Sequence, residues 1–112
     1  MQLFIKAIDA PRNSEIWKVS NPIIAQKNIF KYLDDDVNST LYLSNKKNKK
    51  YMIHDPFENK LVHFGDINYQ DFLKHKNLLR RKLYLNRACN IKSDWKKNKY
   101  SANNLAINVL WN

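Results

Sequence analysis

Apolar and polar residues between positions 39 and 65 follow the short, interrupted pattern that is typical of strands joined by tight turns. Three strand-like runs occur there, STLYLS (39–44), KKYMIHD (49–55) and NKLVHFG (59–65). The connections NKKN and PFEN carry the residues expected in turns between antiparallel neighbours. A further short strand is predicted by QLFIKAID (2–9), which APRNSE terminates. The sequence therefore predicts a small antiparallel meander of three to four strands.

Two further segments have the start signals of helices. In NPIIAQKNIFKYL, Asn21 can cap the helix and Pro22 suits its first position. Its apolar flank is predicted to consist of Ile23, Ile29, Phe30 and Leu33. In SANNLAINVLW, Ser101 can cap a short closing helix whose inward residues are Leu105, Val109 and Leu110. We expect an α+β fold, with two or three helices packed on one face of the meander.

The segment between these helices predicts a third and longer one, from about residue 69 to 87. Asn68 and Asp71 resemble a capping box. At roughly 100° per residue, the inward side is predicted to hold Phe72, His75, Leu78, Leu79, Leu83 and Leu85. Another side would present Lys76, Arg80 and Arg87, bordered by Leu73 and Tyr84. Gly65, the single glycine, is predicted to act as a hinge with a positive φ or a bulge, which lets this helix fold back over the sheet.

Composition bounds the chain to one domain and shows a marked asymmetry of charge. The 112 residues are 44% hydrophobic, and their formal net charge is +10. Residues 1–44 carry five cations and five acids, so the entire positive excess lies in residues 45–112. Such an asymmetry favours an anionic partner on one side of the molecule. The alternative is a protein that uses its charge only to repel its own copies.

Three groups of residues are the candidates for binding nucleic acid or another anionic partner. The first is the hairpin tip, the second the basic side of the long helix, and the third the connector DWKKNKY. The candidates are Lys46, Lys47, Lys49, Lys50, Lys76, Arg80, Arg81, Tyr84, Arg87, Lys96 and Lys97. Each has an ordinary structural alternative, because lysines protect sheet edges from aggregation and an amphipathic helix is polar outside.

No pattern of residues predicts catalysis. Metal-binding spacings, a nucleophile elbow and the glycine-rich loops that hold phosphates are absent, so we predict no catalytic residue, cofactor, metal or small-molecule substrate. A metal or nuclease-like site would require convergence of His54, Asp55, His63, Asp66, Asp71 and His75. DDDVNS begins like a calcium loop but lacks the required glycine and closing glutamate, and we reject that interpretation.

The remaining features concern compartment and solubility. The lone cysteine, Cys89, is predicted to be a small packing residue in a reducing compartment, the alternative being a reactive or intermolecular thiol. The sequence begins without the pattern of a signal peptide. No apolar run approaches the roughly 20 residues that cross a bilayer. We expect a soluble protein without a membrane span.

Residues 49–112 resemble an uncharacterised domain family of large DNA viruses that infect algae and amoebae. The pattern of that family is K-K-Y, H-F-G, D-[FY], H-K-D, R, Y, R-H and a terminal L-W. It is matched by Lys49, Lys50, Tyr51, His63, Phe64, Gly65, Asp71, Phe72, His75, Lys76, Arg80, Tyr84, Arg87, Leu110 and Trp111. Asn77 replaces the acid of H-K-D and Ala88 the histidine of R-H, so neither position supports a catalytic reading.

The resemblance implies a viral origin and a non-enzymatic structural role. We expect a minor capsid, cement or internal component of the virion, present before assembly in the host cytoplasm or the viral factory. Apolar surface near the N-terminus, such as Trp17, would dock on capsid neighbours, and the basic half would contact acidic capsid proteins or packaged DNA. The alternatives are a nucleic-acid-binding protein that acts in the infected cell, and a degenerate metal-dependent nuclease.

Overall fold

A computed structural model describes residues 4–34 and 39–112 of the chain. These residues contain one three-stranded antiparallel sheet in the order β1 (Tyr42–Leu43), β2 (Lys49–Asp55) and β3 (Lys60–Asp66). Tyr51 pairs with Phe64 in the centre of the β2–β3 hairpin, and Tyr42 pairs with Met52 at the β1–β2 edge. The three predicted strand segments are confirmed, although β1 is shorter than its apolar run.

The prediction of a strand over residues 2–9 is wrong for the part of it that the structure describes. Residues 2 and 3, including Leu3, lie outside the described residues. Lys6 forms a single antiparallel bridge with Tyr42. The Leu43 N–H donates to the Ile5 carbonyl at 2.8 Å, and the chain then turns into a 3-10 helix, η1 (Ala7–Asp9). The apolar segment therefore forms one bridge instead of a strand. This bridge lies on the outer edge of β1 and covers a sheet edge that would otherwise be open.

The N-terminal half continues with α1 (Glu15–Val19) and α2 (Pro22–Leu33). As predicted, Pro22 opens α2, and the Asn21 side chain accepts hydrogen bonds from the Ile23 and Ile24 N–H groups at 3.2 Å. Ile29 and Leu33 are buried as expected, whereas Phe30 is partly open to solvent. The acidic segment after α2, considered above as a calcium loop, lies outside the described residues at positions 35–38.

The C-terminal helix closes the core. It begins as α5 (Ala102–Leu105) and continues as one π-helical turn, η3 (Ala106–Leu110). The Ser101 hydroxyl caps it by accepting from the Asn104 N–H at 3.2 Å. The predicted inward residues Leu105, Val109 and Leu110 are all buried. They pack with Tyr51, Ile53 and Phe64 of the sheet and with residues of α2 in one hydrophobic core.

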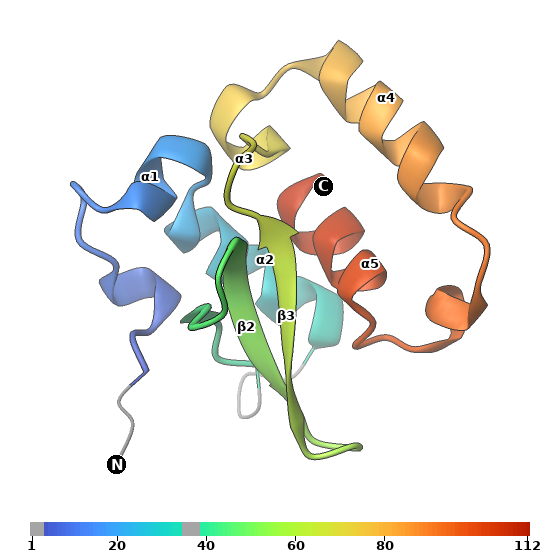
Figure 1. The fold of residues 1–112 in the computed structure, drawn as a ribbon, viewed down its shortest axis with the longest axis horizontal. Coiled ribbons are helices and arrows are strands. Elements are labelled where there is room, and N and C mark those ends of the chain that lie inside the picture. Colours follow the sequence, from blue (N-terminus) through green and yellow to red (C-terminus); the bar gives the residue numbers. More distant parts are fainter. Residues whose placement is uncertain (1–3, 35–38) are drawn as a thin grey trace.

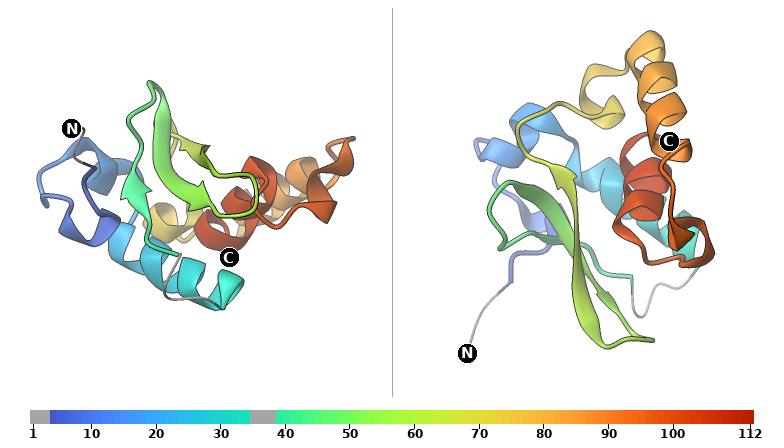
Figure 2. Two further views of the ribbon diagram at one scale, coloured as in Figure 1. Left: turned by 90° about the horizontal axis from the view of Figure 1, so that it is seen from below. Right: turned by 45° about the vertical axis from the view of Figure 1, so that its right-hand side comes forward.

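The α+β prediction is therefore confirmed. Figure 1 shows the chain from blue to red, and the left view of Figure 2 shows α2 and α5 on the same side of the sheet. The sheet is small, so these two helices supply most of the apolar surface opposite its inner face.

The single helix predicted at 69–87 is wrong, because the segment forms two helices. α3 (Phe72–His75) ends at Lys76, whose φ of 53° is left-handed, and α4 (Leu78–Cys89) starts afresh. The cap of α4 is Asn77, whose side chain accepts from the Arg80 N–H at 3.1 Å. The expected capping box at Asn68 does not cap a helix; the N-cap of α3 is Asp71, without a side-chain capping bond.

The orientation predicted for α4 is also wrong. Leu78, Leu79 and Leu83, which were expected to face the sheet, are 72%, 66% and 56% exposed. The side of α4 that meets the body of the protein instead carries the buried Ala88 and the half-buried Tyr84 and Arg81. Figure 1 shows α4 along the rim of the molecule beside α5 rather than over the sheet. Trp111, which contacts Arg81 and Tyr84, holds this side of α4 against the body of the protein.

Candidate functional site

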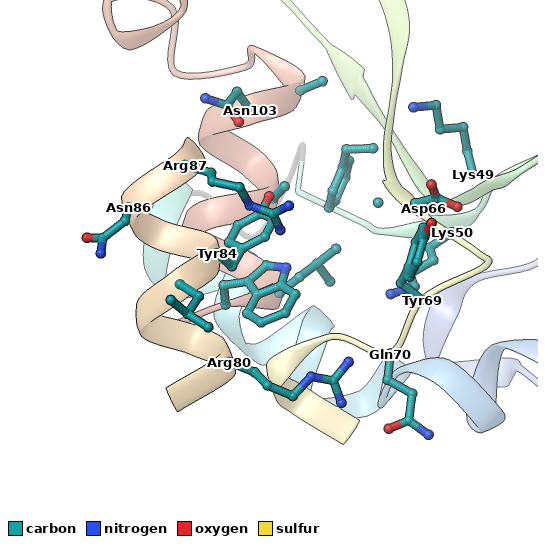
Figure 3. A pocket seen from close by; sticks show the side chains of 17 residues that line it. Lys49, Lys50, Asp66, Tyr69, Gln70, Arg80, Tyr84, Asn86, Arg87 and Asn103 are labelled. Atoms are coloured by element: carbon teal, nitrogen blue, oxygen red, sulfur yellow. The ribbon is translucent and has the colours of Figure 1, made fainter. Parts of the chain in front are cut away.

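A cleft of about 980 Å³ separates α4 from the end of the sheet. One wall is α4, and the opposite wall is the end of β3 with the loop that follows it (Figure 3). Residues of α5 and η3, together with Trp111, also line the cleft. Its polar and aromatic lining residues are Lys49, Lys50, Phe64, Asp66, Tyr69, Gln70, Arg80, Tyr84, Asn86, Arg87, Asn103 and Trp111. Four separate segments of the chain, from β2, from β3 with its following loop, from α4 and from residues 102–111, thus contribute to one site.

The α4 wall presents Arg80, Tyr84 and Arg87. Their spacing of four and three residues places them on one side of the helix, as the sequence predicted. Both arginines are exposed, and no carboxylate of the described residues lies within ion-pairing distance of either. Figure 3 shows Arg80 and Arg87 at the two ends of this wall with Tyr84 between them. Their charges are therefore available to a ligand.

Tyr84 is not the solvent-facing phenol that was expected. Its ring stacks on Trp111 with the centroids 4.1 Å apart and the planes at 7°. Burial raises the pKa of Tyr84, an effect that the Arg87 guanidinium partly opposes, so the phenol is neutral at physiological pH. Trp111 makes a second contact with α4, because its backbone carbonyl accepts a hydrogen bond from the Arg81 Nε at 2.8 Å. Arg81, a predicted binding residue, thus serves to hold the C-terminus against α4.

The opposite wall brings Lys49, Tyr69 and Gln70 toward the arginines. Tyr69 is 66% exposed, and its ring contributes an aromatic surface across the cleft from Tyr84 (Figure 3). Asp66 is the acidic residue of the lining, and its Oδ1 accepts from the Asn68 N–H at 2.9 Å. Cations outnumber acids around the cleft, so the site favours negatively charged ligands.

Gly65 lies at the base of the cleft and has the positive φ that was predicted, +82°. A Cβ there would be 2.8 Å from Leu110 Cδ1 and 3.2 Å from Lys50 Cβ, so the position also requires a small residue. Lys49 pairs with Asp66 and Tyr51 with Phe64, so the register is the same on both sides of Gly65 and no bulge occurs. The glycine therefore permits close packing of the sheet on η3, while the change of direction comes after Asp66.

Lys50 corrects another prediction, because it is not an exposed lysine of the hairpin tip. Its Nζ lies 3.2 Å from Asp71 Oδ2, and the two side chains are 3% and 1% exposed. Burial lowers the pKa of Lys50 and raises the pKa of Asp71, while the attraction between them opposes both shifts. The pair fastens β2 to the start of α3, whose Asp71 N–H also donates to the Val19 carbonyl at 3.0 Å. Lys50 is unavailable to a partner.

The other predicted cations lie away from the cleft. Lys46 and Lys47 are exposed in the β1–β2 turn, and Lys76 is exposed at the joint between α3 and α4. In η2 (Asp94–Lys97), Lys97 is 3.8 Å from Asp94, and Lys96 lies over the Trp95 ring. The structure therefore unites Arg80, Tyr84 and Arg87 with Lys49, and it does not unite the remaining candidates.

The hypothesis of a converging histidine and acid cluster is not supported. Within the described residues, no group of three or more His, Cys, Asp or Glu side chains could hold a metal ion. His54 contacts Asn59, His63 contacts Ser44, and His75 accepts from the Asn77 N–H, all within 3 Å.

Two smaller predictions also need correction. Cys89 is exposed at the end of α4, so it is not a packing residue. Trp17 is half-buried: its Nε1 donates to the Ala10 carbonyl at 3.1 Å and Arg12 covers its ring, which leaves little of it for docking. Among the described helices, none is long and apolar enough to cross a membrane.

Sequence reasoning missed Tyr69, Gln70, Asn103 and Trp111 as members of the site. None of them lies in a basic run, and they come from segments up to 42 positions apart in the chain. Trp111 was noticed only as part of the terminal L-W of the family pattern. The alternation of cations and aromatic residues in α4 was the available signal, and it identified one wall of the cleft.

Comparison with known proteins shows a similarity to one family of unknown function. A family described as "Family of unknown function (DUF5754)" matches residues 39–88. The matched segment runs from before β1 to the penultimate residue of α4, so it includes Lys49, Tyr69, Arg80 and Arg87 but not Asn103 or Trp111. No curated protein and no solved structure shows significant similarity to the chain.

Proposed function

We propose that this protein is a non-enzymatic nucleic-acid-binding protein whose cleft holds a segment of single strand. The observation that carries the proposal is the convergence of Arg80, Arg87 and Lys49 with the exposed ring of Tyr69 on one open cleft. Cations that lack intramolecular carboxylate partners attract phosphates, and aromatic rings stack on bases of any sequence. A single strand presents both its phosphates and its unpaired bases, and the cleft offers cations for the phosphates and an aromatic ring for a base.

The dimensions of the α4 wall suit an extended strand. Arg80 and Arg87 are seven residues apart, which is about 10 Å along a helix axis. They would therefore contact different phosphates of one strand. Tyr69 would stack on a base between the walls. A duplex keeps its bases stacked internally and would gain only the contacts to cations.

The cellular setting we propose is the virion. Support comes from the resemblance of residues 49–112 to the domain family of large DNA viruses, and a basic cleft fits an internal component that contacts packaged DNA. Action on nucleic acid in the infected cell is the alternative. Mass spectrometry of purified particles separates the two: we expect the protein in the particle, and its absence would contradict the virion role while leaving the binding proposal intact.

Salt-dependent binding tests the cleft itself. Fluorescence anisotropy of a labelled mixed-sequence single strand, and of a duplex of the same length, gives the dissociation constant at several KCl concentrations. We expect tighter binding to the single strand. For Arg80→Ala with Arg87→Ala, the slope of log K against log salt should become shallower by about 1.4, since each lost phosphate contact contributes roughly 0.7.

Two further variants separate the cleft from charge in general. Tyr69→Ala should weaken single-strand binding by about tenfold, since a base stacked on an aromatic ring contributes about 1–3 kcal/mol. Lys97→Ala removes an exposed lysine of η2 outside the cleft and should leave binding within about twofold. Equal losses for Lys97→Ala and Arg80→Ala, or salt-insensitive binding, would show that the cleft is not the binding site.

A further inference from the structure

α4 exposes leucines on the side opposite its contacts with the protein body. The leucine patch consists of Leu78, Leu79 and Leu83, each more than half exposed. At roughly 100° per residue, Leu79 points about 180° away from Ala88, the residue that is buried against the body. Three of the four leucines of α4 are thus exposed to solvent, while Leu85 is half-buried. Such a group of exposed apolar residues indicates an interaction surface.

The patch is not a consequence of a loosely placed helix. From the inner side, α4 is held by the stack of Tyr84 on Trp111 and by the Arg81 bond to the Trp111 carbonyl. A third contact is made at the end of the helix, where the Asn103 amide donates to the Ala88 carbonyl at 3.0 Å. These contacts fix the rotation of α4 about its axis, so the leucines remain directed outward.

Charge around the patch selects the partner. Residues 72–93 contain seven lysines and arginines and no aspartate or glutamate. Lys82 lies within the arc of the leucines, and Arg80 lies beside Leu83 at its edge. A second copy of the chain would bring the same cations face to face, at a net charge of +10 for each molecule. Charge complementarity therefore favours an acidic partner with apolar residues at helical spacing.

We propose that the leucine patch is the docking site for an acidic amphipathic helix of another protein. The apolar stripe of that helix would cover Leu78, Leu79 and Leu83, while its carboxylates would pair with Lys82, which lies outside the cleft. Leu78, Leu79 and Lys82 do not line the cleft, and only Leu83 of the patch borders it, so docking there does not require an empty cleft. The inference stands independently of the proposed binding of nucleic acid.

A designed peptide provides the test. The probe is a helical peptide with leucines at i, i+4, i+7 and i+11 and glutamates on both flanks, titrated into ¹⁵N-labelled protein and followed by NMR. We expect the largest shift changes at Leu78, Leu79, Lys82 and Asn86. A matched peptide with lysines in place of the glutamates should not bind.

The variants use positions outside the cleft, so Leu83, which borders it, is left unchanged. Leu78→Gln with Leu79→Gln keeps good helix formers and should weaken peptide binding at least tenfold. Phe57→Gln, at an 86% exposed aromatic residue of the β2–β3 turn, is the matched control and should have no effect. Single-strand binding should be unchanged in the leucine variant, whereas Tyr69→Ala should leave peptide binding unchanged.

Several outcomes would overturn the inference. One is binding that persists in the leucine variant, and another is a set of shift changes centred on Lys49 and Tyr69. A third is concentration-dependent dimerisation of the wild-type chain that the leucine variant abolishes, which would identify a second copy as the occupant. The fourth is binding to vesicles of phosphatidylserine and phosphatidylcholine that the same variant abolishes without any peptide binding, which would identify a lipid surface.

Discussion

At the scale of single residues, the pair of Lys50 and Asp71 is almost fully buried, so both charges lose their hydration on folding. Replacing Lys50 with Met leaves the Asp71 carboxylate buried without a counter-charge, and we expect a loss of about 3–5 kcal/mol in unfolding free energy. Adding Asp71→Leu should recover most of that loss, because an apolar pair avoids the desolvation of both charges. Urea denaturation of the two variants measures this. A single variant as stable as the double would contradict the account.

His75 gives a second prediction at this scale, one of pH dependence. Burial, followed by the charges of Arg80 and Lys50, lowers the pKa of His75 below its usual range. Its Nδ1 accepts from the Asn77 N–H at 2.9 Å, so the folded state requires that nitrogen to be unprotonated. A histidine with a lowered folded pKa contributes stability above its unfolded pKa of about 6.5, and loses it as pH falls through the folded pKa.

The matched variant is His75→Asn, whose side-chain oxygen keeps an acceptor near the Asn77 N–H but does not titrate. We expect wild type to lose more unfolding free energy than His75→Asn between pH 7.5 and pH 5. His63, whose pKa is lowered by burial and by Lys46 and Lys49, contributes to both proteins alike. Parallel stability curves for the two proteins would exclude a role for His75.

At the scale of elements, Gly65 links β3 to η3 and yields a prediction for folding. An alanine there has the unfavourable φ of +82° and a Cβ 2.8 Å from Leu110 Cδ1. We expect Gly65→Ala to lower the unfolding free energy by about 2 kcal/mol or more, measured by denaturation. In a Leu110→Ala background, the Cβ added by Gly65→Ala no longer meets the Leu110 side chain, but the backbone strain remains. If Gly65→Ala then has no effect relative to Leu110→Ala alone, the φ angle is unimportant.

The boundaries of helices and strands could be predicted where residues at the boundary itself determine them. Asn21 and Pro22 fixed the start of α2, and the two turn segments fixed the ends of β2 and β3. The break between α3 and α4 was not predictable from Lys76, because lysine is a good helix former and rarely adopts the left-handed conformation. Asn77 was a possible signal for that break, because asparagine is a common N-cap residue. The prediction instead placed Asn77 in the interior of one helix.

The orientation of α4 could not be read from its own sequence at all. Its leucines satisfy the pattern of a helix buried against a core, yet Trp111 and Asn103 attach the opposite side. Those residues lie beyond the end of α4, so only the tertiary structure brings them together. The same limit applies to the cleft. The shared helix side of Arg80, Tyr84 and Arg87 was predictable from their spacing, whereas the position of Lys49 and Tyr69 on the opposite wall was not.

At the scale of the whole molecule, α4 is a separate rigid element attached to the sheet-containing body chiefly through Trp111. Trp111→Ala removes the stack with Tyr84, and such pairs contribute about 0.5–1.5 kcal/mol beyond the area they bury. We therefore expect the amides of α4 to exchange with solvent about tenfold faster, the equivalent of about 1.4 kcal/mol in local opening. Amides of β2 and β3 should keep their protection, because Tyr51, Ile53 and Phe64 remain in the core.

Hydrogen exchange followed by mass spectrometry or NMR measures this pattern, and Leu79→Gln on the exposed side of α4 is the control that should leave it unchanged. Because Arg80 and Arg87 are carried by α4, a loosened helix no longer holds them opposite Lys49 and Tyr69. Trp111→Ala should therefore also weaken single-strand binding, although we assign Trp111 chiefly the role of positioning α4. Faster exchange spread evenly over α4, β2 and β3 would mean global destabilisation, and the two-part organisation of the molecule would then be wrong.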